Sequence, residues 1–252
     1  MTPHRIHARR GGGRGNRRGG GGRPATAAPF DPLTQSPERW LRGGDWVLNT
    51  GKIATWTDKS GNGRDYTQAT AGARPTTGTL GGQDAAVFSS AAATAVIGPA
   101  GTGAAAHAFI IVQLDADPPA SGNGGLWEFG TDASDTHFPF SDNNIYDDFG
   151  TTVRKTVGNP TPSLAAVRLY EVVSAAGEWT ARLDGAQIFT TATNTVGWSA
   201  SSALGGAVSG ASGTRLNGKI AEFINFTTKR TAPQLAELYG YFEARYSGLV
   251  LP

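Results

Sequence analysis

The chain has 252 residues, of which 38% are hydrophobic and 17% charged, and it contains no cysteine. This length suits one large β domain, and the lack of cysteine excludes a disulfide scaffold or a thiolate metal site. The longest apolar run, around residues 109–112, is far below the roughly 18 residues that a membrane span needs. Since the N-terminus also lacks the apolar core of a signal peptide, we expect a soluble protein that has no membrane partner and is not exported by a cleaved signal.

The net charge of +2 hides a strong asymmetry along the chain. Residues 1–23 carry no acid and seven arginines: Arg5, Arg9, Arg10, Arg14, Arg17, Arg18 and Arg23. The other 15 basic residues face all 20 acidic residues, so the first 23 residues have a charge of +7 and the remainder −5. We interpret residues 1–23 as a basic Gly/Arg-rich arm that is disordered alone and docks onto an acidic surface of a partner protein.

Two other interpretations of this arm stay open. It could be a tail that only improves solubility, or it could bind nucleic acid through its arginines. The arm lacks the interleaved aromatic residues that stack on bases in single-strand binders, so we rank nucleic acid last.

Residues 24–37 are expected to be a Pro/Ala linker, and residues 38–252 a globular domain. The stretch from Pro37 to Leu41 is interpreted as a single helical turn. Residues 46–48 and 52–56 then flank Asn49-Thr-Gly51, a pattern that predicts a hairpin.

The next stretch, residues 56–88, predicts a strand, a glycine turn, a second strand, a loop and a third strand. The turn residues either bond backbone amides through their side chains or adopt positive φ without strain. They are Asp58, Ser60, Gly61, Asn62 and Gly63.

Further short strands follow at the spacing of an all-β sandwich, about a dozen in total. They are expected within residues 105–114, 125–129, 145–146, 163–174, 179–183, 186–189 and 218–226. Asp184-Gly185 is a specific hairpin signal between two of them.

One convincing helix is expected at the end of the chain, from Thr231 to Tyr246. Thr231 can cap it while Gln234 reaches back, and an apolar stripe recurs at helical spacing. The stripe residues, which we expect to pack on the sandwich, are Leu235, Leu238, Tyr239, Phe242 and Tyr246.

Four pieces of the sequence occur in a characteristic order: Trp-x-Asp-x-Ser-Gly-Asn-Gly at 56–63, Thr-Gln-Ala-Thr at 67–70, Arg-Pro at 74–75, and a strand ending in Phe88. In this order they resemble the opening of the laminin-G-like, concanavalin A-like jelly-roll domains of many bacterial and tailed-phage proteins. The last strand and helix resemble the family's ending. The resemblance implies an all-β jelly-roll β-sandwich with a short C-terminal helix, preceded here by the basic arm.

The most polar and aromatic part of the domain is residues 127–149. It contains Ser-Asp-x-Asn-Ile-Tyr-Asp-x-Phe-Gly at 141–150, followed by Arg154-Lys-Thr156, and phage-borne members of the resembled family often carry a similar stretch. Planar amides, carboxylates and aromatic rings are also what a sugar-binding loop uses. The candidate carbohydrate-binding residues are Trp127, Asp142, Asn143, Asn144, Tyr146 and Asp147.

Calcium is a competing interpretation of this loop, because Asp142, Asn144 and Asp147 could offer oxygen ligands. The glycine and the final glutamate of an EF-hand loop are missing, so a capped turn is the preferred interpretation, and we expect no metal and no cofactor.

Catalysis is not expected. No nucleophile elbow, zinc-binding helix or phosphate loop is present, and His107 is interpreted as a structural residue. Glu128, Asp132 and Asp135 lack the spacing of jelly-roll glycosidases.

We therefore predict a non-enzymatic structural component of a tailed-phage virion, in a symmetric assembly, anchored by its arm to a neighbouring subunit. A glycan-binding lectin for host attachment is the first alternative, and nucleic-acid binding through the arm is the second.

Overall fold

The computed structural model describes residues 1, 29–118, 124–132, 136–207 and 214–252. Within these residues the structure has two 3-10 helices, η1 (Pro32–Gln35) and η2 (Ala71–Ala73), and one α-helix, α1 (Ala232–Arg245). Its strands are β1 (Arg39–Asn49), β2 (Lys52–Asp58), β3 (Tyr66–Thr67), β4 (Thr76–Leu80), β5 (Gln83–Phe88), β6 (Val96–Pro99), β7 (Ala105–Leu114), β8 (Trp127–Glu128), β9 (Ile145–Asp147), β10 (Lys155–Gly158), β11 (Arg168–Ala175), β12 (Glu178–Leu183), β13 (Ala186–Thr191), β14 (Ser201–Leu204) and β15 (Gly218–Phe226).

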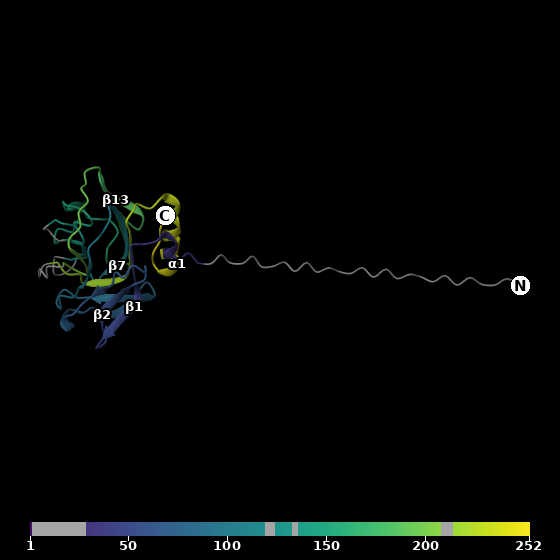
Figure 1. Cartoon of the computed structure of the whole chain (residues 1–252), viewed down its shortest axis with the longest axis horizontal. Coiled ribbons are helices and arrows are strands. Elements are labelled where there is room, and N and C mark those ends of the chain that lie inside the picture. The colour runs from purple at the N-terminus through teal and green to yellow at the C-terminus, as the bar shows by residue number, and fades with distance from the viewer. Residues whose placement is uncertain (2–28, 119–123, 133–135, 208–213) are drawn as a thin grey trace.

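The described strands pair only antiparallel and form a sandwich-like, all-β fold. One continuous path runs β13-β12-β11-β7-β15-β5-β4-β2-β3-β6-β14-β8, with β1 joining β15 to β2, while β9 and β10 form a separate pair. In Figure 1 the β1–β2 hairpin lies at the end of the body distant from β13, and α1 lies to one side of the strands. The expectation of an all-β fold with a short C-terminal helix is confirmed.

Side-chain alternation along β7 and β11 separates two cores. Ile110 and Tyr170 point into the larger core, which also buries Trp56, Trp127 and Phe149. The neighbouring residues on the same strands, among them Phe109, Ile111 and Leu169, point the other way, toward the stripe of α1. Helix α1 and strand β9 therefore lie over opposite faces of one sheet.

Two buried glutamates fix α1 to its sheet. Glu222 accepts hydrogen bonds from the hydroxyls of Tyr241 (2.7 Å) and Tyr246 (2.5 Å) and from the Trp40 indole. Glu171 accepts one from the Tyr239 hydroxyl at 2.5 Å. The stripe residues Leu238, Tyr239, Phe242 and Tyr246 are buried, which confirms that they are core residues, and Leu235 is partly buried against the same core.

The glycine turn has the predicted geometry. Gly61 and Gly63 have φ of +85° and +67°. The carboxylate of Asp58 accepts from the backbone N–H groups of Ser60 (2.9 Å), Arg64 (3.0 Å) and, on β1, Trp40 (2.9 Å). One side chain therefore organises the turn and also ties it to the first strand.

The Asn62 amide reaches beyond its own turn and donates to the carbonyl oxygens of Pro37 and Glu38, at 3.1 and 2.9 Å. Both predicted hairpins are present, and their turn residues, Thr50-Gly51 and Asp184-Gly185, have positive φ.

Several expectations about element bounds are corrected. Residues 39–41 are extended and pair with β15, so the helical turn expected from Pro37 to Leu41 is instead the 3-10 helix at 32–35. That helix lies inside the segment expected to be a linker. It forms there because Asp31 caps its N-terminus and Pro32 fixes the backbone of its first turn. Strand β11 begins at Arg168, five residues later than expected, and the sequence did not single out β4 as a strand.

The seven arginines of the arm lie outside the described residues. Among the residues that the structure does describe, no helix is long and apolar enough to span a membrane.

Candidate functional site

The six residues predicted to bind carbohydrate do not share one environment. Trp127 is 1% exposed and Asp147 is fully buried. The Asp147 carboxylate accepts hydrogen bonds from the Trp127 indole (3.1 Å), the Tyr170 hydroxyl (2.8 Å) and the Phe149 backbone N–H (2.7 Å). These two residues are therefore part of the core beneath the loop, and we remove them from the candidate surface.

Burial also raises the pKa of Asp147 and of its neighbour Asp148. Loss of solvation raises the pKa of Asp147 to about 6, although its three hydrogen bonds oppose the change. Burial raises the pKa of the neighbouring Asp148 well above its usual value, and the hydrogen bond from the Thr136 hydroxyl (2.7 Å) opposes it. Two adjacent buried carboxyl groups thus lie under the surface turn.

Asp142 and Tyr146 close that turn on the surface. One Asp142 oxygen accepts the Asn144 backbone N–H at 2.9 Å, and the other accepts the Tyr146 hydroxyl at 2.7 Å. The backbone hydrogen bond, followed by that of Tyr146, lowers the pKa of Asp142. The side chain of Asp142 is therefore used to cap the turn, as the preferred interpretation predicted.

The calcium interpretation requires Asp142, Asn144 and Asp147 to act together. The carboxylate of Asp142 is bonded within the surface turn, whereas that of Asp147 is bonded to core residues. Across the described part of the chain, no group of three His, Cys, Asp or Glu side chains could hold a metal ion.

One side of the turn carries an aromatic hollow of about 150 Å³, lined by His137, Phe140, Tyr146 and Arg154. Phe140 meets Tyr146 edge to face, with ring centroids 5.9 Å apart, and His137 lies 4.7 Å from Phe140. The guanidinium of Arg154 lies 4.9 Å from the centroid of the Tyr146 ring. The hollow therefore combines flat apolar rings with one cation.

Backbone pairing places these residues. His137 and Tyr146 exchange two backbone hydrogen bonds of 2.8 and 2.9 Å, which brings the loop at 137–140 beside β9. Thr156 of β10 pairs with Tyr146 of β9, and Arg154, two residues earlier, projects on the same face and reaches the Tyr146 ring diagonally. The sequence showed the aromatic composition of this loop and the basic residues after it, but not this register, and so His137, Phe140 and Arg154 were missed as site residues.

A second, polar hollow of about 400 Å³ also borders the turn. Asn143 lines it together with Asp117, Pro118, Asn159, Pro160, Thr161 and Ser163. Asn143 has a positive φ of 67°, and its buried Oδ1 atom has no hydrogen-bond partner among the described residues. Most of the residues that line this hollow are polar, so it suits a ligand that carries hydroxyl groups.

His107, the histidine considered for catalysis, lies away from these hollows. Asp132 lies near the aromatic hollow, where it accepts the Arg154 backbone N–H at 2.8 Å, and Asp135 is outside the described residues. His107 is fully buried, its Nε2 lies 2.8 Å from Glu171, and its Nδ1 accepts the Arg230 backbone N–H at 3.0 Å. Burial lowers the pKa of this histidine. Glu171 also contacts Arg182 and Tyr239, so the cluster packs between the sheet and α1.

No protein-family model and no curated protein matches this chain. Among solved structures, it is similar to Trypanosoma rangeli sialidase in complex with the inhibitor DANA, with a TM-score of 0.54 and 12% identity over 85% of this chain and 35% of that chain. It is also similar to the receptor binding domain of botulinum neurotoxin mosaic serotype C/D, with a TM-score of 0.57 and 10% identity over 82% of this chain and 51% of that chain.

A third similar structure is of botulinum neurotoxin type C, whose cell entry depends on interaction with two ganglioside molecules. The TM-score is 0.55 and the identity 10%, over 84% of this chain and 52% of that chain. The chain thus spans about a third to a half of the chains it matches. At such identities the likeness establishes the fold alone, an all-β, lectin-like sandwich.

Proposed function

We propose that this protein is a non-enzymatic carbohydrate-binding module whose ligand lies across the turn at residues 140–146. The observation that carries the proposal is the pair of hollows on this turn, one aromatic and one polar. A sugar ring has an apolar face that packs on an aromatic ring and hydroxyl groups that need polar partners. The fold adds support, because one similar structure is of a toxin described by its interaction with gangliosides.

Each residue has a distinct part in this proposal. The Tyr146 and Phe140 rings pack on the sugar, and Arg154 donates to an oxygen of the ligand. Asn143 lines the polar hollow that receives the hydroxyl groups of the ligand. Asp142 acts indirectly, because its hydrogen bond fixes the Tyr146 ring. The ligand is bound and left intact.

The test is a glycan array followed by titration of the best glycan. We expect Tyr146→Ala and Asn143→Gly each to weaken binding by about tenfold, since loss of one packing ring or one polar contact costs on the order of 1.4 kcal/mol. Glycine is used at 143 because this residue has a positive φ of 67°. Val153, which is 60% exposed beside Arg154, offers a matched control, and Val153→Ala should bind normally.

Three outcomes of this test count against the proposal. An array that is blank both for the purified protein and for any particle that contains it would remove the lectin function. Unchanged affinity in both hollow variants would place the site elsewhere. Binding that requires calcium would assign Asp142 to a metal and revive the competing interpretation.

We further propose that this module has a jelly-roll topology and sits on the outside of a tailed-phage particle, with residues 1–23 as its anchor. The support is the sequence: seven arginines without an acid in those residues, and the phage-like stretch at 141–150. Arginine holds carboxylates bidentately, so an acidic surface of a neighbouring subunit suits the arm.

Deletion of residues 1–23 tests the anchor. The truncated protein should fold and fail to join the particle. Incorporation at the normal copy number would assign anchoring to the sandwich. Tight, steeply salt-dependent binding of the full chain to nucleic acid would favour that alternative.

A further inference from the structure

The aromatic hollow has a positively charged side chain in its wall and no carboxylate. Arg154 lines it together with His137, Phe140 and Tyr146. Arg154 is held at two points. Its backbone N–H donates to Asp132 at 2.8 Å, and its guanidinium lies over the Tyr146 ring, 4.9 Å from the centroid. The cation therefore has a fixed place beside the aromatic rings.

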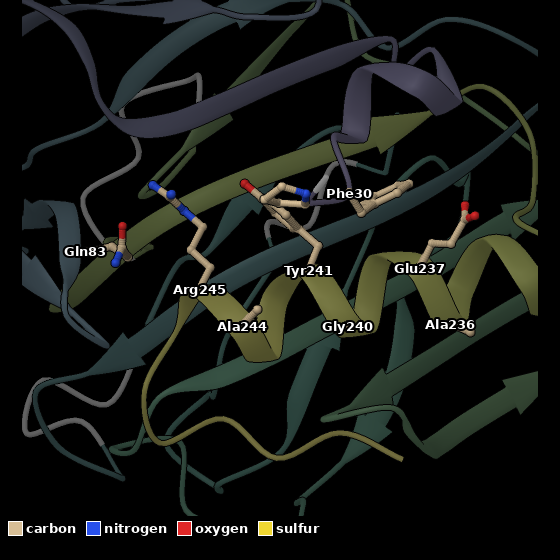
Figure 2. A pocket seen from close by; sticks show the side chains of 9 residues that line it. Phe30, Gln83, Ala236, Glu237, Gly240, Tyr241, Ala244 and Arg245 are labelled. Carbon is tan, nitrogen blue, oxygen red and sulfur yellow. The ribbon is translucent and has the colours of Figure 1, made fainter. Parts of the chain in front are cut away.

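Three other hollows among the described residues include a carboxylate. Figure 2 shows the groove of about 540 Å³ along α1, with Glu237 toward one end and Arg245 toward the other. A hollow of about 760 Å³ beside the glycine turn is lined by both Glu38 and Arg64. The polar hollow has Asp117 and no cation among its lining residues. By the charge of its wall, the aromatic hollow is thus the one of these four that suits an anion.

Two carboxylates bond to residues of the aromatic hollow without lining it. Asp142 accepts the Tyr146 hydroxyl at 2.7 Å and the Asn144 backbone N–H at 2.9 Å. Asp132 accepts the backbone N–H of Arg154. Both carboxylates are therefore used to position the ring and the arginine.

We propose that the ligand of this site is a carboxylated sugar whose carboxylate binds Arg154; this inference rests on the proposed function and names the class of its ligand. A guanidinium carries several N–H donors in a rigid plane that matches both oxygens of a carboxylate. Such charge-assisted hydrogen bonds are about twice as strong as neutral ones. Pockets that enclose a whole ligand measure roughly 300 to 1,000 Å³. A hollow of about 150 Å³ therefore receives one end of the ligand, its carboxylate and one sugar face.

Titration of the full chain with acidic sugars and their methyl esters tests the ligand class. The probes are sialyllactose and oligogalacturonate, each compared with its methyl ester, which keeps the sugar and removes the charge. We expect at least one acid to bind, and to bind about tenfold or more tightly than its ester, because a hydrogen bond to a charged group is lost in the ester. Lactose and sulfated lactose complete the set.

Three variants assign the preference to one side chain. Arg154→Ala should bring the affinities of acid and ester to about the same value, and Arg154→Lys, which keeps the charge without the planar fork, should retain part of the preference. Lys155→Ala is the matched control, because it removes a neighbouring cation that bonds to the Thr193 carbonyl and does not line the hollow. It should keep the full preference. The comparison of acid with ester needs no variant, so it stands even if a substitution disturbs the fold.

Equal binding of acid and ester would overturn the ligand class, as would a preference that survives Arg154→Ala. Sulfated lactose bound as tightly as sialyllactose would show that the hollow selects charge alone, and would overturn the carboxylate assignment. A neutral glycan bound through Tyr146, with neither acid bound, would overturn this inference and leave the proposed function standing. A glycan array without any binder would remove both.

Discussion

At the scale of single residues, Asp147 is a carboxyl group held in the core below the surface turn. Its pKa is raised to about 6 by burial, whereas an unfolded aspartate titrates near 3.8. The folded state therefore binds the proton more tightly than the unfolded state does. The stabilisation from this group is complete below pH 4 and is lost as the pH rises through 6.

We predict that the stability of the wild type depends on pH more strongly than that of Asp147→Asn, whose side chain at 147 does not titrate. On lowering the pH from 7.5 to 4, the wild type should gain about 2 kcal/mol of unfolding free energy relative to the variant, because Asp147 takes up its proton near pH 6 in the folded state and only near pH 3.8 in the unfolded state. Urea unfolding at each pH measures it. Parallel pH profiles for the two proteins would mean that Asp147 is not buried as described.

Gly61 shows how a backbone angle alone can specify a residue. Its φ is +85°, and a Cβ atom there would meet nothing within 4 Å, so the turn needs glycine for its angle and not for space. We predict that Gly61→Val costs about 1 to 3 kcal/mol of stability through strain. Gly72 is an exposed control with equally open surroundings and no positive φ, and thermal unfolding of Gly72→Val should show a clearly smaller loss.

At the scale of elements, α1 is fixed by a buried carboxylate as well as by its apolar stripe. Glu222 is 1% exposed and accepts bonds from Trp40, Tyr241 and Tyr246. We predict that Glu222→Ala costs more than about 3 kcal/mol, because it leaves several buried donors without an acceptor. Denaturant unfolding measures this cost.

Two variants separate the hydrogen bonds of Glu222 from other effects. Glu222→Gln keeps one acceptor oxygen and should lose less stability than Glu222→Ala. Glu237→Ala removes an exposed glutamate from α1 and should cost less than about 1 kcal/mol. Equal losses for Ala at 222 and at 237 would show that the hydroxyl bonds do not hold the helix.

At the scale of the whole molecule, the two proposed surfaces are independent. The proposed sugar surface lies on the side of the larger core, whereas Phe30, which comes after the arm in sequence, packs against the smaller core with α1. We predict that removal of residues 1–23 leaves both the thermal unfolding midpoint and the glycan affinity unchanged. Calorimetry and glycan titration of residues 24–252 test this. A lower affinity after truncation would mean that the arm reaches the sugar surface.

Local chemistry made much of the fold predictable. Strand β7 matches the expected apolar segment Ala105–Leu114, strand β15 matches Gly218–Phe226, and Asp184-Gly185 forms the expected turn. In these segments the pattern of apolar residues and the turn residues agree with the final structure. The first strand was less predictable, because residues 39–41 become a strand by pairing with β15, far away in sequence.

The sequence by itself determined the all-β class, the hairpins, the C-terminal helix and the loop that carries the candidate site, because periodicity and turn chemistry are local properties. Only the tertiary structure decided which residues of that loop reach the surface. Trp127 and Asp147 carry the same chemical groups as a sugar site but fall on the core side of their strands, while His137, Phe140 and Arg154 are brought to Tyr146 by strand register. Burial and register depend on contacts between distant segments, so residue type alone could not assign them.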